Sequence, residues 1–131
     1  MAKGPLVERL TDAGRLLIEL LDRTRLEIRS ALWLYRSESE DWVLVVAVPD
    51  AVSKGPRAVY RKIERIFSLN RSALLPLKLA DVVVMVPNDP LLTLLSRAIQ
   101  TGPSISEIRF SQNRIGDTLI EDALIYRLQA S

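Results

Sequence analysis

The sequence contains neither cysteine nor histidine. Without cysteine there can be no disulfide, no thiolate metal site and no cysteine nucleophile. Without histidine there can be no histidine-ligated zinc, no Ser-His-Asp catalysis and no histidine proton shuttle. The remaining options are carboxylate sites for hard metals, lysine or tyrosine chemistry, and anion binding by arginine.

Glycine and long hydrophobic runs are also scarce. The five glycines form neither G-x-G-x-x-G nor G-x-x-x-x-G-K-[ST], so a glycine-rich nucleotide cradle is not expected. The longest apolar runs, WVLVVAV and DVVVMV, are far shorter than a membrane span, and the first residues, MAKGPLVERL, lack the pattern of a signal peptide. We therefore expect a cytoplasmic protein that binds no cofactor and no membrane.

The composition is that of a globular domain. The 131 residues are 48% hydrophobic and 26% charged, which predicts one domain over residues 1–131. The net charge of +2 makes no case for nucleic acid by itself, so a basic site would have to arise from local clustering. Arginine outnumbers lysine by 14 to 4, a bias that suits a high-GC bacterial genome.

Hydrophobic periodicity and turn residues predict the order α-β-β-α-β-α-β-β. We expect helices at 6–22, 56–69 and 90–100, and strands at 26–36, 41–48, 81–86, 104–110 and 118–128. Residues 49–56 are predicted to be a loop, and 111–117 a polar hairpin loop. The predicted fold is a single α+β domain with a mixed five-stranded sheet, two antiparallel hairpins and two crossover connections.

The first predicted helix has an unusually wide apolar stripe. Its leucines, isoleucine and valine fill an arc of about 200°, wider than the stripe of an ordinary surface helix. More than one layer must cover such a stripe, and a second copy of the chain could be one of them. We therefore predict a homodimer that uses Leu10 and Leu17.

The helix that begins at Pro56 carries a row of arginines. Arg57, Arg61 and Arg65 recur every fourth residue, and Lys54 precedes the helix. Like charges at this spacing destabilise a helix slightly, so the row favours an anion partner, such as a phosphate or a nucleic acid. The alternative is a solvated face whose arginines pair with acids elsewhere on the surface.

Carboxylates offer a second kind of site. Asp50, Asp81 and Asp122 lie at or near strands and are the candidate ligands for a hard metal ion. A nuclease of the restriction-endonuclease type would require E-x-K. The chain has only E-I-R, and arginine cannot replace that lysine because it stays protonated.

Glu121 and Asp122 are adjacent acids inside an otherwise apolar strand, so their side chains should point to opposite faces of the sheet. A buried carboxylate without a partner is costly. Three arrangements would avoid this cost: a β-bulge that turns both acids outward at the sheet edge, an ion pair with Arg36 or Arg109, or a functional acid.

Polar and aromatic residues of the two hairpins are the last candidates. Gln112, Asn113 and Arg114 could contact a ligand, although such residues also suit turns. Trp33 and Trp42 flank the first hairpin turn, and we expect them to face each other as a packing pair. If both were exposed instead, they would form a partner-binding patch.

These observations favour a non-enzymatic, self-associating protein-interaction module with an unidentified protein partner. The first alternative is a phosphate or nucleic-acid binder that uses the basic face of the helix at 57–69. The second is a metal-dependent enzyme of the phosphodiesterase type that uses aspartate and glutamate.

Overall fold

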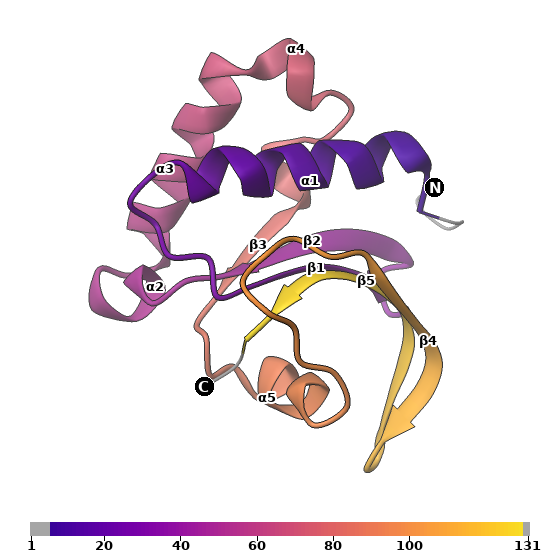
Figure 1. Cartoon of the computed structure of the whole chain (residues 1–131). Helices are drawn as coiled ribbons and strands as arrows, with labels where there is room; N and C mark the ends of the chain where they lie inside the picture. Colours follow the sequence, from indigo (N-terminus) through magenta and orange to yellow (C-terminus); the bar gives the residue numbers. More distant parts are fainter. Residues whose placement is uncertain (1–5, 130–131) are drawn as a thin grey trace.

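The five strands form one mixed sheet in the order β3-β2-β1-β5-β4 (Figure 1). The structure is a computed structural model that describes residues 6–129. The strands are β1 (Ser30–Arg36), β2 (Asp41–Ala47), β3 (Val82–Met85), β4 (Ile108–Ile115) and β5 (Thr118–Leu128). The helices are α1 (Glu8–Asp22), α2 (Asp50–Ser53), α3 (Pro56–Leu69), α4 (Arg71–Leu74) and α5 (Pro90–Ser96), with the 3-10 helix η1 (Leu79–Asp81). The predicted α+β class and the mixed five-stranded sheet are confirmed.

One of the two predicted crossovers is present. The chain leaves β2, passes through α3 and returns in β3, which is parallel to β2. The second connection is different: it carries the chain past α5 to the opposite edge of the sheet, where β4 runs antiparallel to β5. The prediction was wrong here because β5, which is mostly buried, pairs with β1 and leaves β4 only the outer position.

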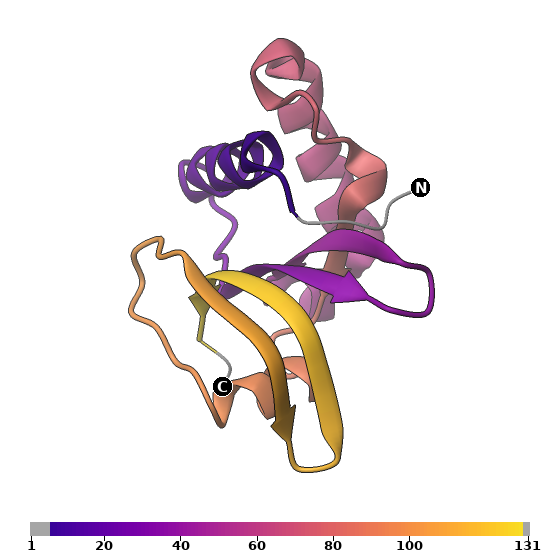
Figure 2. The same cartoon turned by 90° about the vertical axis from the view of Figure 1, so that its right-hand side faces the viewer.

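The two faces of the sheet have unequal cover. Figures 1 and 2 show α1, α3 and α4 over one face and α5 alone over the other. Each face has its own hydrophobic cluster, one around Leu17, Trp33 and Tyr126, the other around Leu32, Leu92 and Ile125. Within residues 6–129, no helix is long and apolar enough to cross a membrane.

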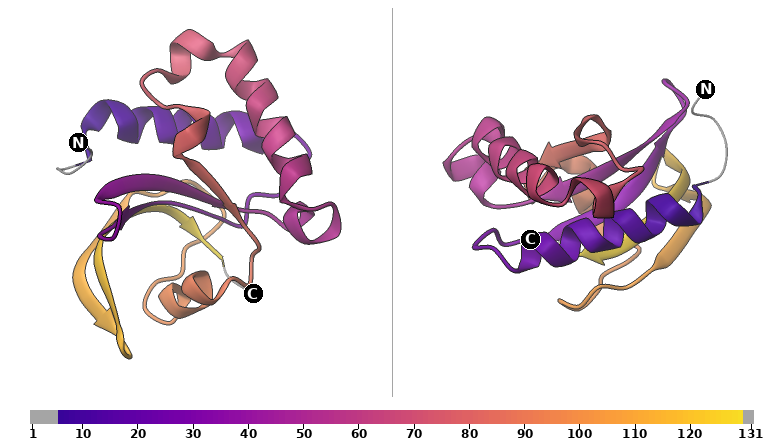
Figure 3. Two further views of the ribbon diagram at one scale, coloured as in Figure 1. Left: turned by 180° about the vertical axis from the view of Figure 1, so that it is seen from behind. Right: turned by 90° about the horizontal axis from the view of Figure 1, so that it is seen from above.

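The wide apolar stripe of α1 is covered within the chain. Leu17, Ile18 and Leu21 are fully buried, and Leu10 is half-buried against the same cluster. The covering layers are the sheet on one side and α3 and α4 on the other (Figure 3). The width of the stripe therefore gives no argument for a second chain, and Leu17 is not available to one.

Two predicted loops contain regular structure. Residues 49–56 include the single-turn helix α2, because Pro49 has an αR backbone and permits one turn before Gly55. Residues 111–115 continue β4, so the loop that joins β4 to β5 is only Gly116 and Asp117. Gly116 has a φ of 60°, the left-handed conformation that a two-residue hairpin turn needs at its first position.

Gly14 permits the closest approach between α1 and the sheet. A Cβ atom built on Gly14 would lie 2.7 Å from Trp33 Nε1 and 2.7 Å from Tyr126 Oη. Trp33 Nε1 donates to Tyr126 Oη at 3.0 Å, and that hydroxyl donates to the carbonyl of Thr11 in α1. Burial raises the pKa of Tyr126 above its ordinary value, so the hydroxyl stays protonated as a donor.

A β-bulge in β5 turns Arg127 toward α1. Leu32 pairs with Ile125 and Ala31 with Arg127, so Tyr126 is one extra residue opposite β1. Arg127 is 5% exposed, and its guanidinium makes two hydrogen bonds with Asp22, at 3.0 and 2.8 Å. This pair joins the last turn of α1 to the central part of the sheet.

Candidate functional site

The helix α3 begins where the sequence predicts it. Pro56 occupies its first turn, and Gly55 before it has a φ of 87°, which turns the chain into the helix. Val59 and Ile63 are buried against the sheet. The position of α3 along the β3 edge is visible in Figure 3.

Tyr60 ties α3 to the free edge of the sheet. Its hydroxyl accepts a hydrogen bond from the N–H of Val84 at 2.9 Å and donates to the carbonyl of Val82 at 3.4 Å. Both groups belong to β3, which is an edge strand and would otherwise offer them to another chain. The inner face of α3 is therefore anchored, and only its outer face is open to partners.

The outer face of α3 carries a row of free arginines. Arg57, Arg61 and Arg65 are exposed, and none of them has a hydrogen-bond or ion-pair partner within residues 6–129. The same spacing of four residues leads next to Leu69, which is 74% exposed. Three cations and one leucine thus form a stripe about 18 Å long that winds by about 120° around the helix. We call these four residues the α3 stripe.

Lys54 does not add to this row as an unpaired cation. Its Nζ lies 3.6 Å from Asp50 Oδ2, and the Nζ of Lys62 lies 3.7 Å from the same atom. Asp50 therefore neutralises part of the charge at the start of α3. The three arginines remain the exposed and unpaired part of the predicted site.

The predicted metal ligands are not brought together. Asp50 meets the two lysines, Asp81 Oδ2 accepts the backbone N–H of Lys78 at 2.9 Å, and Asp122 pairs with Arg109. In the described part of the chain, no group of three or more acids, histidines or cysteines could hold a metal ion. The metal-dependent alternative has no geometric support in residues 6–129.

Asp122 forms an ion pair, as one of the three predicted arrangements requires. Arg109 donates to its two carboxylate oxygens at 2.6 Å each, and Ser111 Oγ donates at 2.7 Å. The hydrogen bond from Arg109 lowers the pKa of Asp122, with a smaller contribution from Ser111. Arg109 also lies 5.6 Å from the centre of the Trp42 ring, which places the cation over an aromatic face.

The strand β5 runs through Glu121 and Asp122 without a bulge. Its pairing with β4 keeps one register on both sides of these residues, so the prediction of a bulge there is wrong. Arg36, the second predicted ion-pair partner, pairs instead with Asp41 across the first hairpin, at 3.0 and 2.9 Å. Glu121, which has no paired residue in β4 within residues 6–129, lines a pocket on the α5 side of the sheet together with Ile120.

The tryptophans do not pair with each other. Trp33 lies opposite Leu44 in the sheet and Trp42 lies opposite Tyr35, because the turn at 37–40 sets a register that pairs Arg36 with Asp41. Tyr35 and Trp42 make an edge-to-face contact with ring centres 5.5 Å apart. Trp33 is buried and Trp42 half-buried, so they do not form an exposed patch.

Comparisons of the chain with models of protein families, with curated proteins and with solved structures gave no match.

Two exposed leucines, Leu69 and Leu75, are not among the residues predicted from the sequence. The sequence contains a signal for Leu69, because Leu69 follows Arg65 at the same spacing of four residues that separates the arginines. Leu75, 60% exposed, lies beyond α4 and has no such periodic signal. Gln112, Asn113 and Arg114 lie in β4 and are exposed, so they belong to a strand surface and not to a loop.

Proposed function

We propose that the domain is a non-enzymatic protein-interaction module, and that the α3 stripe binds an acidic segment of a partner protein. The observation that carries the proposal is the row of Arg57, Arg61 and Arg65, exposed and unpaired in residues 6–129, which continues into the exposed Leu69. Guanidinium groups bind carboxylates with paired hydrogen bonds. A leucine at the end of the row adds an apolar contact, which suits a protein segment that carries an apolar residue beside its acids.

Two further observations favour protein over nucleic acid as the partner. The domain has a net charge of only +2, whereas nucleic-acid binders usually present a larger basic surface. Binding of single strands also relies on exposed aromatic rings that stack on bases. The aromatic residues of α3 are Tyr60, bonded to the β3 edge, and Phe67, half-buried in the core.

The proposal is tested with a synthetic peptide and a matched nucleic acid. The peptide is a labelled helical segment with glutamate at every fourth position and one leucine at the end of the acidic face. Its binding is followed by fluorescence anisotropy and should weaken steeply as salt is added, since exposed charges are screened. A peptide with glutamine in place of each glutamate is the first control.

Variants locate the binding on α3. The double change Arg61→Glu and Arg65→Glu should weaken binding by about 100-fold, because two charge-assisted pairs are replaced by repulsion. The double change Arg97→Glu and Arg114→Glu alters the net charge equally, at exposed arginines without a partner in residues 6–129, and should have little effect. Leu69→Ser should weaken peptide binding several-fold.

A single-stranded DNA of similar charge decides between the two anion partners. If it binds more tightly than the peptide, and Leu69→Ser leaves both affinities unchanged, the nucleic-acid interpretation replaces ours. If neither ligand binds at low salt, the arginine row is a solvated face and the proposal is wrong.

Self-association is a separate proposal. With α1 covered within the chain, a homodimer would need another surface, and an isologous pairing of two α3 stripes would oppose like charges. Light scattering at micromolar concentration distinguishes a dimer from a monomer of 14.7 kDa.

A further inference from the structure

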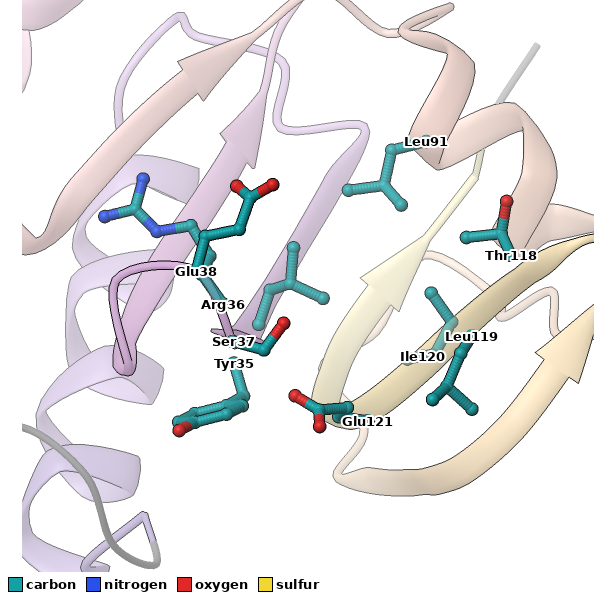
Figure 4. Close-up of a pocket in the computed structure, with 10 residues that line it drawn as sticks. Tyr35, Arg36, Ser37, Glu38, Leu91, Thr118, Leu119, Ile120 and Glu121 are labelled. Atoms are coloured by element: carbon teal, nitrogen blue, oxygen red, sulfur yellow. The ribbon is translucent and has the colours of Figure 1, made fainter.

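A pocket of about 210 Å³ lies on the α5 face of the sheet, between the first hairpin and β5. Figure 4 shows the two sides, with Tyr35, Arg36, Ser37 and Glu38 on one and residues 118–121 on the other. Leu91 of α5 closes the pocket at one end. Leu91 is the second residue of α5, so the pocket lies beside the start of this seven-residue helix.

Glu121 brings a charge into this pocket that nothing in the described chain neutralises. Its Oε1 atom is buried and has no hydrogen-bond partner within residues 6–129. The nearest cation in the lining, Arg36, is held by both carboxylate oxygens of Asp41, at 3.0 and 2.9 Å. A carboxylate that has one oxygen buried and no ion-pair partner is costly, so this position favours a cationic ligand beside Glu121.

The walls around the carboxylate are largely aliphatic. Ile120 is buried, Leu34 and Leu91 are half-buried, and all three belong to the hydrophobic cluster of this face. Glu38, exposed in the turn of the first hairpin, adds a second carboxylate to the lining. An apolar wall with acids on two sides complements an aliphatic stem that ends in a cation.

We propose that this pocket binds the side chain of a lysine or arginine from a partner protein, with the ammonium or guanidinium group donating to the carboxylate of Glu121 and the methylene stem packing on Leu34, Leu91 and Ile120. The site lies on the opposite face of the sheet from the α3 stripe and has the opposite charge. It depends on none of the residues of that stripe, so either proposal can fail without the other.

The chemistry is tested first with small probes, by following backbone amide signals in NMR titrations. n-Butylammonium carries both the stem and the cation, and it should shift the amides of 34–38 and 118–121 to saturation. Ammonium chloride has no stem and 1-butanol has no charge, so neither should produce the same saturating shifts. Equal responses to butylammonium and butanol would show an apolar pocket without a role for Glu121, and would overturn the proposal.

Variants test the role of the carboxylate. Glu121→Gln keeps the shape of the side chain and should weaken butylammonium binding by about tenfold or more, the loss expected for one charge-assisted hydrogen bond. Asp117→Asn removes the same charge from the exposed β4–β5 turn and should leave the affinity unchanged. If both variants weaken binding equally, the effect is one of net charge and the proposal is wrong.

A peptide identifies the source of the cation. An acetylated, amidated pentapeptide with one central lysine between alanines should shift the same amides and should lose affinity in Glu121→Gln. Glu38→Gln should weaken it to a smaller extent, and this second variant keeps the test decisive if Glu121→Gln folds poorly. Binding of butylammonium without binding of the peptide would contradict a protein side chain as the occupant.

Discussion

Asp22 and Asp122, on the face of the sheet that α1, α3 and α4 cover, pair with arginines, whereas Glu121 on the α5 face has a buried oxygen without a partner in residues 6–129. Asp122 and Glu121 are adjacent in β5, and only Asp122 has an ion-pair partner within residues 6–129. On the first face Asp22 matches the charge of Arg127, which is 5% exposed, although Arg127 Nε has no hydrogen-bond partner within residues 6–129. The pair of Asp122 and Arg109 is more exposed. On the other face, one short helix leaves part of the sheet open, and a charge can lie in a pocket where an external group can reach it.

The largest expected loss of stability comes from truncating one buried leucine in each of the two hydrophobic clusters. Leu17 in α1 and Leu92 in α5 are both fully buried. Leu17→Ala should lower the free energy of unfolding by about 3–5 kcal/mol, and Leu92→Ala by about 2–3 kcal/mol, because a seven-residue helix can settle into the cavity more easily. Urea unfolding monitored by circular dichroism measures both. A larger loss for Leu92 would contradict the unequal cover of the two faces.

The second prediction tests whether the buried charge of Arg127, on the face of the sheet that α1, α3 and α4 cover, needs its partner. Asp22→Asn leaves Arg127, only 5% exposed, without a counter-charge. Loss of one partner of a buried pair is expensive, but Asp22 is itself 35% exposed, so we expect a loss of about 2–3 kcal/mol. The pair of Glu27, 67% exposed, and Arg29, 26% exposed, gives a control: Glu27→Gln should cost less than about 1 kcal/mol. Equal costs would mean that burial of Arg127 contributes nothing.

A substitution at Gly14 tests how closely α1 packs on the face of the sheet that it covers. Gly14→Ala would favour the helix by about 1 kcal/mol in isolation. The added Cβ, however, would lie 2.7 Å from the ends of two buried rings, Trp33 and Tyr126, which have no free space to move. We expect a net loss of about 1–2 kcal/mol, within the usual range for overpacking. A gain in thermal stability would show that α1 can shift away from the sheet.

The sequence was sufficient to predict the elements in which the periodicity is strong. The α1 helix, the first hairpin, α3 and β3 all lie within a few residues of their predicted positions. Local patterns of apolar residues determine these elements, and caps and prolines mark their ends. The wide stripe of α1 was recognised, but a pattern on one helix cannot tell whether the covering layer belongs to the same chain.

Features that depend on pairing were not predictable in the same way. The position of β4 at the far edge follows from which strand lies beside β1, and the bulge at Tyr126 follows from the register of β5 against β1. Both arise from contacts between residues far apart in the chain. The same holds for the site: the row on α3 is visible in the sequence, whereas the pocket around Glu121 requires the first hairpin, β5 and the start of α5 to lie side by side.

The smallest effect bears most directly on the two adjacent acids. Asp122→Asn removes a pair in which Arg109 is about half exposed, so it should lower stability at pH 7 by only about 0.2–1 kcal/mol. Glu121→Gln removes a charge with no partner in the described chain and should leave stability unchanged or raise it by up to about 1 kcal/mol. Unfolding in urea at pH 7 compares the two variants directly.

A second measurement at low pH separates the ion pair from any further role of Asp122. Because the hydrogen bond from Arg109 lowers the pKa of Asp122 in the folded state, the stabilisation is present above the unfolded pKa of about 3.9 and is lost as the pH falls through the folded pKa. The difference between the parent protein and Asp122→Asn should therefore be largest near pH 7 and should shrink below about pH 4. A difference that persists at pH 3 would mean that Asp122 stabilises the fold as a neutral hydrogen-bonding group, and that the contrast with Glu121 is not one of charge pairing.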